Sequence, residues 1–169
     1  MPVVTPSFVA NVPLPQGHTA GLLGLLVMDH LVPIPWPGRR GGQRPTGVVL
    51  ALIGTALNVW AVAERRRVST AVFRLEEPQD LVTSGPYALT RHPMYLGWGL
   101  MHLGIGLVRQ SPWVLVTLPI AIAVDHRAAL REDAELARAF GDDFDRYRRR
   151  RPTVVERLSR RAQVVARSL

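Results

Sequence analysis

The apolar stretch 46–63, TGVVLALIGTALNVWAVA, most constrains what this chain can fold into. It contains no charged residue and approaches the ~20 apolar residues that a helix needs to cross a bilayer. A charged run, 64–67, follows it directly. Backbone groups in lipid must be hydrogen-bonded within their own segment, so a stretch of this kind is helical. The sequence therefore predicts a membrane-spanning α-helix here.

Three further apolar stretches predict an all-α, multi-pass membrane bundle of about four spans. They are residues 19–35, 93–108 and 112–125. The first is the weakest, because it is short and contains Asp29 and His30. Pro93 suits a first helical turn, where its missing N–H leaves no bond unmade, and this makes His92 the expected N-cap residue.

The rest of the chain has a different character. Residues 126–151 are charged and amphipathic, with apolar residues at helical spacing interrupted by Gly141. They predict a cytoplasmic helical segment that folds back over the span ends. Residues 152–169 form a basic tail. Residues 1–16 lack a basic n-region, so they do not resemble a cleavable signal peptide.

The basic residues predict the orientation in a cell membrane. All 21 are Arg, the net charge is +8, and 17 of the Arg lie between the second and third stretches or from Arg127 onward. Positive residues collect on the cytoplasmic side, so that loop and the C-terminus are expected there. Arg39, Arg40 and Arg44 oppose this, so either the first stretch does not fully cross or three outside Arg are tolerated. Arg148–Arg151 are expected to meet anionic membrane lipids.

Composition excludes several chemistries. The chain has no Cys and no Lys, which rules out disulfides, thiolate chemistry and a lysine Schiff base. No zinc-ligand spacing or nucleic-acid fold signature is present, so neither a metal site nor a nucleic-acid partner is expected.

The segment 84–97, SGPYALTRHPMYLG, concentrates the reactive side chains. It is polar and turn-rich, and it leads directly into the third apolar stretch. Arg91, His92 and Tyr95 therefore lie where a span begins. This position favours a site that serves both a water-soluble and a lipid-dissolved molecule.

Two motifs in order carry a family resemblance. Gly85-Pro86-Tyr87 and the run Arg91 to Gly97 form the first; Glu132-Asp133 and Phe140-Gly141 with Tyr147 form the second. Together they resemble the isoprenylcysteine carboxyl methyltransferases and phospholipid N-methyltransferases, integral membrane enzymes. Asp133 replaces a usual Glu, Phe144 a usual Tyr and Thr153 a frequent Arg. The chain 1–169 is expected to be a single domain of this type.

The resemblance implies methyl transfer from S-adenosylmethionine to a lipophilic or small amphipathic acceptor at the cytoplasmic membrane face. The implied cofactor-binding residues are Tyr87, His92, Pro93, Tyr95, Glu132 and Asp133. The implied catalytic residues are His92 and Arg91. Arg91 would offer a fork to a carboxylate, and Glu132 would accept from ribose or amino groups. If the acceptor is an amine or thiol, His92 would be its base, because a helix N-terminus disfavours imidazolium.

Simpler roles stay open for the same residues. His92 could only cap a helix, Tyr87 and Tyr95 could be interfacial aromatics, and Arg91 could be a positive-inside anchor. Glu132 and Asp133 could form a solvated helix face.

Two rival functions and three intramembrane polar residues also stay open. One rival is an NADPH-dependent, sterol-type membrane reductase, and the other is a non-enzymatic transporter or scaffold with Asp29, His30 and His102 as a proton path. His102 could line an acceptor pocket or bond a neighbouring span, and Asn58 is expected to make an interhelical hydrogen bond. The sequence specifies neither the acceptor nor the oligomeric state.

Overall fold

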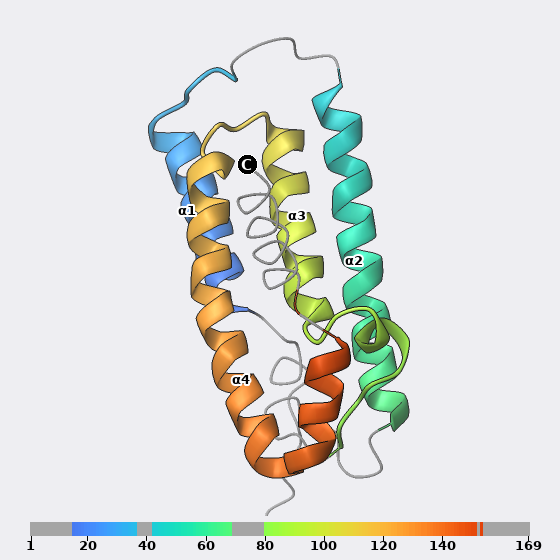
Figure 1. The fold of residues 1–169 in the computed structure, drawn as a ribbon. Helices are drawn as coiled ribbons and strands as arrows, with labels where there is room; N and C mark the ends of the chain where they lie inside the picture. Colours follow the sequence, from blue (N-terminus) through green and yellow to red (C-terminus); the bar gives the residue numbers. More distant parts are fainter. Residues whose placement is uncertain (1–14, 37–41, 69–79, 152, 154–169) are drawn as a thin grey trace, which may run out of the picture.

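The computed structural model describes residues 15–36, 42–68, 80–151 and 153. Four α-helices run up, down, up and down along one bundle (Figure 1). They are α1 (Gln16–Leu31), α2 (Gln43–Val68), α3 (Pro93–Arg109) and α4 (Val114–Arg150), with a 3₁₀ helix at Gly85–Ala88. Within the described residues all regular structure is helical, which confirms the predicted all-α class.

The predicted spans coincide with helices, with shifted ends. α1 ends at Leu31, four residues before the predicted limit, because Val32 precedes Pro33 and a residue before proline avoids helical geometry. α4 begins at Val114 rather than 112 and continues to Arg150, with a break at Gly141. By length and hydropathy, α2 is the helix in the described ranges that could cross a membrane. α1 and α3, with 16 and 17 residues, are shorter than the ~20 residues that a helix needs to cross a bilayer.

Glycines bring α2 and α3 into backbone contact. A Cβ at Gly104 would lie 2.6 Å from the carbonyl oxygen of Gly47, and one at Gly54 would lie 2.4 Å from that of Gly97. Small residues at such crossings let membrane helices pack closely. Asn58 Nδ2 donates to Met101 Sδ at 3.4 Å, which confirms the predicted interhelical bond.

Hydrogen bonds join the C-terminal end of α1 to the connection between α3 and α4. Arg109 donates to Asp29 Oδ2 through Nε at 2.9 Å and Nη2 at 2.6 Å. Trp113 Nε1 donates to the Val32 carbonyl at 3.0 Å. The partner of Asp29 is therefore at the end of α3, and these bonds fix α1 against the α3–α4 connection.

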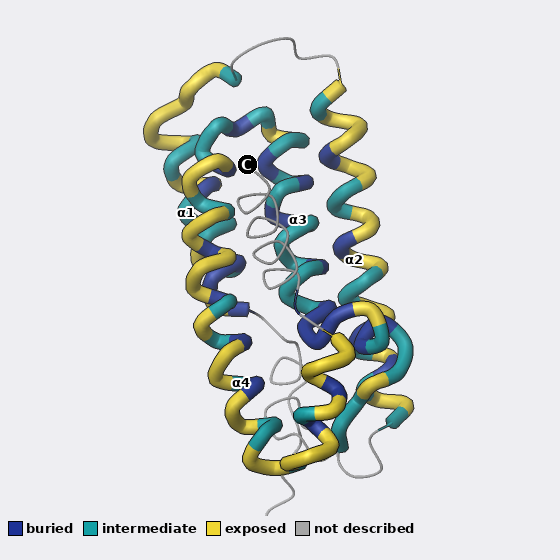
Figure 2. The backbone as a smooth tube through the Cα atoms, viewed as in Figure 1, coloured by how far each residue is buried: buried dark blue, intermediate teal, exposed yellow. Residues whose placement is uncertain are grey.

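Exposed residues follow the outward-facing sides of the helices (Figure 2), and many of them are large and apolar. α1, α2 and α4 all expose them; Leu23, Leu52 and Leu115 are 60%, 64% and 63% exposed. Exposed apolar side chains in this number indicate an interaction surface rather than a face for water.

The chain reverses direction inside α4. Gly141 has φ 49° and ψ −123°, a conformation that L residues avoid, and the predicted interruption at this glycine is confirmed. The following turns fold back beside the foot of the bundle (Figure 1), where Phe144 and Tyr147 are buried. We call this end, formed by residues 80–92 and 142–151, the motif end. The basic tail 152–169, apart from residue 153, and residues 1–14 lie outside the described residues.

Candidate functional site

The foot of α2 fixes the Gly-Pro-Tyr turn. Glu64 accepts hydrogen bonds from Arg67 and from the Ser84 hydroxyl. These bonds lower the pKa of Glu64 to about 2, and the bond from Arg67 has the largest effect. Gly85 has φ 57°, and a Cβ there would lie 2.8 Å from Glu64 Cγ. The turn therefore needs glycine for both its conformation and its close approach to α2.

The start of α3 directs His92 sideways. His92 occupies the N-cap position with φ −123° and ψ 64°, and Pro93 follows in the first turn, as predicted. The imidazole makes no capping hydrogen bond. Its ring points toward α4 instead, so the side chain does more than end a helix.

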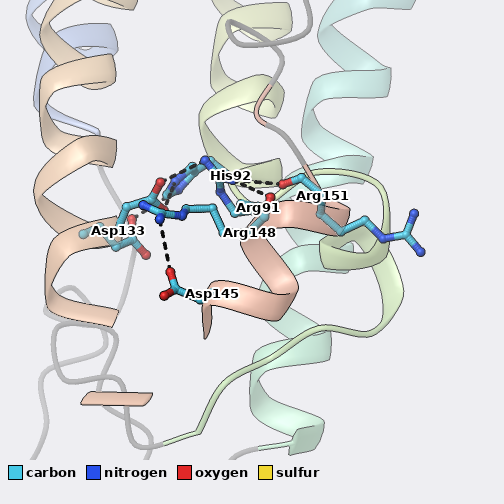
Figure 3. A network of polar contacts seen from close by, with 7 residues as sticks. Arg91, His92, Asp133, Asp145, Arg148 and Arg151 are labelled. Carbon is cyan, nitrogen blue, oxygen red and sulfur yellow. Dashed lines mark hydrogen bonds and ion pairs between the residues drawn. The ribbon is translucent and has the colours of Figure 1, made fainter. Parts of the chain in front are cut away.

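Side chains from the start of α3 and from α4 meet at the motif end, where Arg91 and His92 point toward Asp133 (Figure 3). Arg91 Nη2 donates to Asp133 Oδ2 at 3.0 Å, and His92 Nε2 lies 3.0 Å from Asp133 Oδ1. His92 Nδ1 lies 3.5 Å from Glu132 Oε2. We call Arg91, His92, Glu132 and Asp133 the His92 cluster. The two sequence motifs, some forty residues apart, therefore form one arrangement.

The two carboxylates hold His92 in its charged form. Burial disfavours the imidazolium, but hydrogen bonds and charge from Asp133 and Glu132 outweigh it and raise the pKa of His92 to about 9. Burial likewise opposes the charge on Asp133, yet His92 and Arg91 lower the pKa of that carboxyl. The expectation that the helix N-terminus keeps His92 neutral is therefore wrong, because two adjacent carboxylates act more strongly than the helix dipole.

Arg91 joins the returning part of α4 with its C-cap residue, residues 142–151, to the His92 cluster. We call residues 142–151 the fold-back segment. Its Nη1 donates to the carbonyl oxygens of Arg148 at 3.1 Å and Arg151 at 3.2 Å. The residue is 5% exposed. These contacts place the guanidinium among protein groups rather than in a cavity, so Arg91 holds α4's returning end in position.

Two cavities meet beside the His92 cluster. An apolar cavity of about 300 Å³ is lined by α3 and α4 side chains such as Leu96, Leu100 and Ile122, and by His92 at one end. A polar cavity of about 450 Å³ is lined by groups that include Arg127, Arg131, Glu132 and Glu135. Tyr95 and Asp125 line both cavities, so they form the wall between them.

Some of the predicted site residues line the two cavities, and the others hold the surrounding structure in place. Tyr95 lines both cavities, with its ring centroid 5.6 Å from that of His92. Glu132 lines the polar cavity. Pro93 is buried in the first turn of α3. Tyr87 is not among the residues lining these two cavities; its carbonyl accepts from the Tyr147 hydroxyl at 2.8 Å, which packs the fold-back segment onto the turn.

Two residues at the wall were missed from the sequence, His18 and Asp125. Both are buried and line the apolar cavity. Asp125 carried a usable signal, because a carboxylate at the end of an apolar stretch is a candidate functional group. His18 carried none, since it lies before the first apolar stretch with no motif around it.

Known proteins resemble this chain over part of its length. Isoprenylcysteine methyltransferases are among them: human protein-S-isoprenylcysteine O-methyltransferase is 29% identical over 111 residues, 64% of this chain and 39% of the relative. The cobalt-zinc-cadmium resistance protein CzcN of Cupriavidus metallidurans is 46% identical over 80 residues, 47% of this chain and 37% of the relative. The nickel-cobalt-cadmium resistance protein NccN of Alcaligenes xylosoxydans xylosoxydans is 40% identical over 81 residues, 47% of this chain and 38% of the relative.

The chain spans between 37% and 54% of the length of the curated relatives it matches. No solved structure matches it. The family model for phospholipid methyltransferases matches residues 43–143, which contain α2, α3 and most of α4. The matched residues include the first motif and all of the second except Tyr147. Since that match covers more than half of the 169 residues, the chain belongs to the phospholipid methyltransferase family.

Proposed function

We propose that this protein is a membrane-embedded methyltransferase that uses S-adenosylmethionine and methylates a lipophilic or small amphipathic acceptor. The observation that carries the proposal is the pair of cavities, one polar and one apolar, separated by Tyr95 and Asp125 beside the His92 cluster. A polar donor in one cavity and an apolar acceptor in the other could meet at this wall.

The polar cavity fits the methyl donor. S-adenosylmethionine supplies an activated methyl group on a sulfonium, and it carries an amino acid, a ribose and an adenine. Arg127 and Arg131 offer guanidinium forks for its carboxylate. Glu132 and Glu135 can accept from its amino and hydroxyl groups. Tyr95 presents a ring face to a cation at the wall.

The apolar cavity suits the acceptor. Its leucine and isoleucine lining favours an alkyl or isoprenoid chain, and its volume of about 300 Å³ lies at the lower end of the range for ligand pockets. Methyl transfer by in-line displacement requires close approach, alignment and exclusion of water. The aliphatic lining is half-buried or exposed, so water would be excluded only once an acceptor fills the cavity.

A multi-pass arrangement in a cell membrane, with the motif end cytoplasmic, completes the proposal. Exposed apolar side chains on α1, α2 and α4 support a bundle surrounded by lipid. Arg65, Arg66 and Arg67 lie at the motif end of α2, and three Arg end α4. This concentration of positive charge supports a cytoplasmic motif end, where Arg148–Arg151 would contact anionic lipid headgroups.

Cofactor binding by the purified, detergent-solubilised protein tests the function. Isothermal titration calorimetry is expected to show S-adenosylmethionine binding in the micromolar range. The Glu132→Gln variant should bind about tenfold or more weakly, because a charged hydrogen bond contributes ~1.5–3 kcal/mol. Asp143→Asn, a change in an exposed ion pair of the fold-back segment, is the matched control and should bind normally.

Each other result has a meaning. Absence of S-adenosylmethionine binding by the wild type would overturn the proposal. Binding of NADPH instead would support a reductase of the sterol type. Binding of neither would favour a transporter or scaffold.

A further inference from the structure

A second polar cluster lies among α1, α3 and α4, outside both sequence motifs. His18, His102 and Asp125 are 1%, 0% and 3% exposed. Asp125 accepts from the backbone N–H groups of Gly17 at 2.8 Å and His18 at 3.0 Å, which fixes the first turn of α1 against α4. Buried polar groups of this kind are costly unless they are fully bonded, so their arrangement is closely defined.

A chain of hydrogen bonds links His18 to His102 and Thr117, and the direction of the Thr117 bond selects one of the two possible His18 tautomers. The Thr117 hydroxyl donates to the Trp113 carbonyl at 3.1 Å, so its oxygen accepts from His102 Nε2 at 3.0 Å. A neutral imidazole with a proton on Nε2 has an acceptor at Nδ1. His102 Nδ1 therefore accepts from His18 Nδ1, 3.2 Å away. His18 Nε2 is then left with a free lone pair.

This lone pair faces the wall between the cavities. His18 lines the apolar cavity, and its Nε2 is 3.7 Å from Asp125 Oδ2. A Cβ at Gly99 of α3 would lie 3.6 Å from Nε2, so glycine leaves that edge of the ring uncovered by a side chain. Burial lowers the pKa of His18, so the ring is neutral before the reaction. The adjacent carboxylate would stabilise the imidazolium that forms when Nε2 accepts a proton.

The position matches the point where donor and acceptor would meet. Asp125 lines both cavities and lies seven residues before Glu132, which at 1.5 Å per residue is about 10 Å along the same face of α4. His92 lines the apolar cavity as well, but its two carboxylate partners keep it protonated. His18 is therefore the better placed base. It also lies outside the residues that match the family model, 43–143.

We propose that His18, assisted by Asp125, is the proton acceptor in methyl transfer, and that the acceptor is a lipophilic molecule whose nucleophilic atom carries a proton, a thiol or an amine. The inference rests on the proposed function. The nucleophile–methyl bond forms as the methyl–sulfonium bond breaks, and the bonding electrons leave with the sulfur as a neutral thioether. The nucleophile's proton moves to His18 Nε2, and Asp125 balances the new charge. A carboxylate acceptor would need no such base.

The tautomer of His18 can be tested without any turnover. The chain has five His, so ¹⁵N NMR of histidine-labelled protein in detergent at neutral pH can resolve each ring, with His→Gln variants for assignment. His18 is expected to carry its proton on Nδ1 with Nε2 unprotonated, and His102 to carry its proton on Nε2. A proton found on His18 Nε2 in the protein without ligands would overturn the proposal.

Single-turnover methylation of three 12-carbon probes tests the chemistry. Dodecanethiol and dodecylamine carry a proton on the nucleophile, and dodecanoate does not. His18→Gln should slow methylation of the thiol or amine about 100-fold, the lower range for a general base, with S-adenosylmethionine affinity unchanged. His30→Gln, a change in an exposed residue at the other end of α1, should leave all rates unchanged.

The outcomes separate the inference from the function it rests on. A wild-type protein that fails to bind S-adenosylmethionine contradicts the proposed function, and one that binds it and methylates only dodecanoate contradicts the role of His18. An equal loss for dodecanoate in His18→Gln would show a structural role instead. If His18→Gln does not fold, or no probe is methylated, the NMR result on the wild type decides.

Discussion

Asp133 is the residue on which the motif end depends, because one carboxylate serves both Arg91 and His92. The Asp133→Asn variant would leave a buried guanidinium and a buried imidazolium without their shared counter-charge. Loss of one partner of a buried ion pair costs about 3–5 kcal/mol. The melting temperature in detergent, followed by differential scanning fluorimetry, should therefore fall clearly. Asp143→Asn, whose pair with Arg146 is exposed, should change stability by less than about 1 kcal/mol. Equal melting temperatures for the two variants would contradict this role.

The raised pKa of His92 makes stability depend on pH in the alkaline range. The folded-state pKa is about 9 against 6.5 for the free side chain, so the native state binds the proton more tightly than the unfolded state. The resulting stabilisation, of order 3 kcal/mol, is complete below about pH 6.5 and is lost as pH rises through 9. Asp133, Glu132 and Tyr95 face the ring. Melting temperatures of the wild type should fall between pH 6.5 and 9. Those of His92→Gln should change much less, and parallel curves would rule the linkage out.

At the scale of the element, Gly141 determines that α4 turns back. Ala at this position would meet no neighbouring atom, so its cost comes from the backbone alone, about 1–3 kcal/mol for a residue held at φ 49° and ψ −123°. Gly141→Ala should loosen the fold-back segment, and trypsin should cut Arg148–Arg151 faster. Gly42→Ala is matched, because a Cβ there is equally unobstructed and no positive φ is required. Unchanged cleavage of Gly141→Ala would mean that Arg91 and Tyr147 hold the segment without the turn.

At the crossing of α2 and α3, glycine is required for a different reason: the space for a side chain is limiting, not the backbone conformation. A Cβ at Gly104 would lie 2.6 Å from the Gly47 carbonyl oxygen and 2.7 Å from the Ala51 backbone nitrogen. Gly104→Ala should therefore separate the helices and cost about 1–3 kcal/mol, measured as a lower melting temperature in detergent. At Gly24 the nearest atom is 4.0 Å from such a Cβ, so Gly24→Ala should be tolerated. If both substitutions are tolerated, the close backbone approach is not required.

The positions of the helices could be predicted from the sequence. The rotation of each helix about its own axis could not. Apolar runs and prolines located the helices, because both act within a few residues of sequence. The sequence predicted both Glu132 and Asp133 as cofactor-binding residues, but it did not show that Asp133 bonds both Arg91 and His92. Adjacent helical residues point about 100° apart, so a small rotation of α4 decides between them. His18 and His102 are 84 residues apart, and only the packing of α1 on α3 brings them together.

For the whole molecule, the outer surface and the ends of the bundle carry different information. In the proposed arrangement, the exposed apolar side chains of α1, α2 and α4 would face the acyl chains of a bilayer. The two ends of the bundle would then lie on opposite sides of it. Glu64, the Arg run 65–67 and the fold-back segment gather at the motif end, while Gly42 and the Asp29–Arg109 pair lie at the other end (Figure 1).

The absence of cysteine from the sequence makes that orientation directly measurable. Single-cysteine variants can be treated with a membrane-impermeant maleimide in right-side-out and inside-out vesicles. Arg66→Cys and Asp143→Cys, both exposed at the motif end, should be modified only in inside-out vesicles, because positive charge stays cytoplasmic. Gly42→Cys, exposed at the opposite end of α2, should be modified only in right-side-out vesicles. The wild type provides the blank. Modification of Arg66→Cys and Gly42→Cys from the same side would mean that α2 does not cross. Reversed sidedness of all three would retain the bundle but place the site on the outer face, where a cytoplasmic methyl donor could not reach the polar cavity.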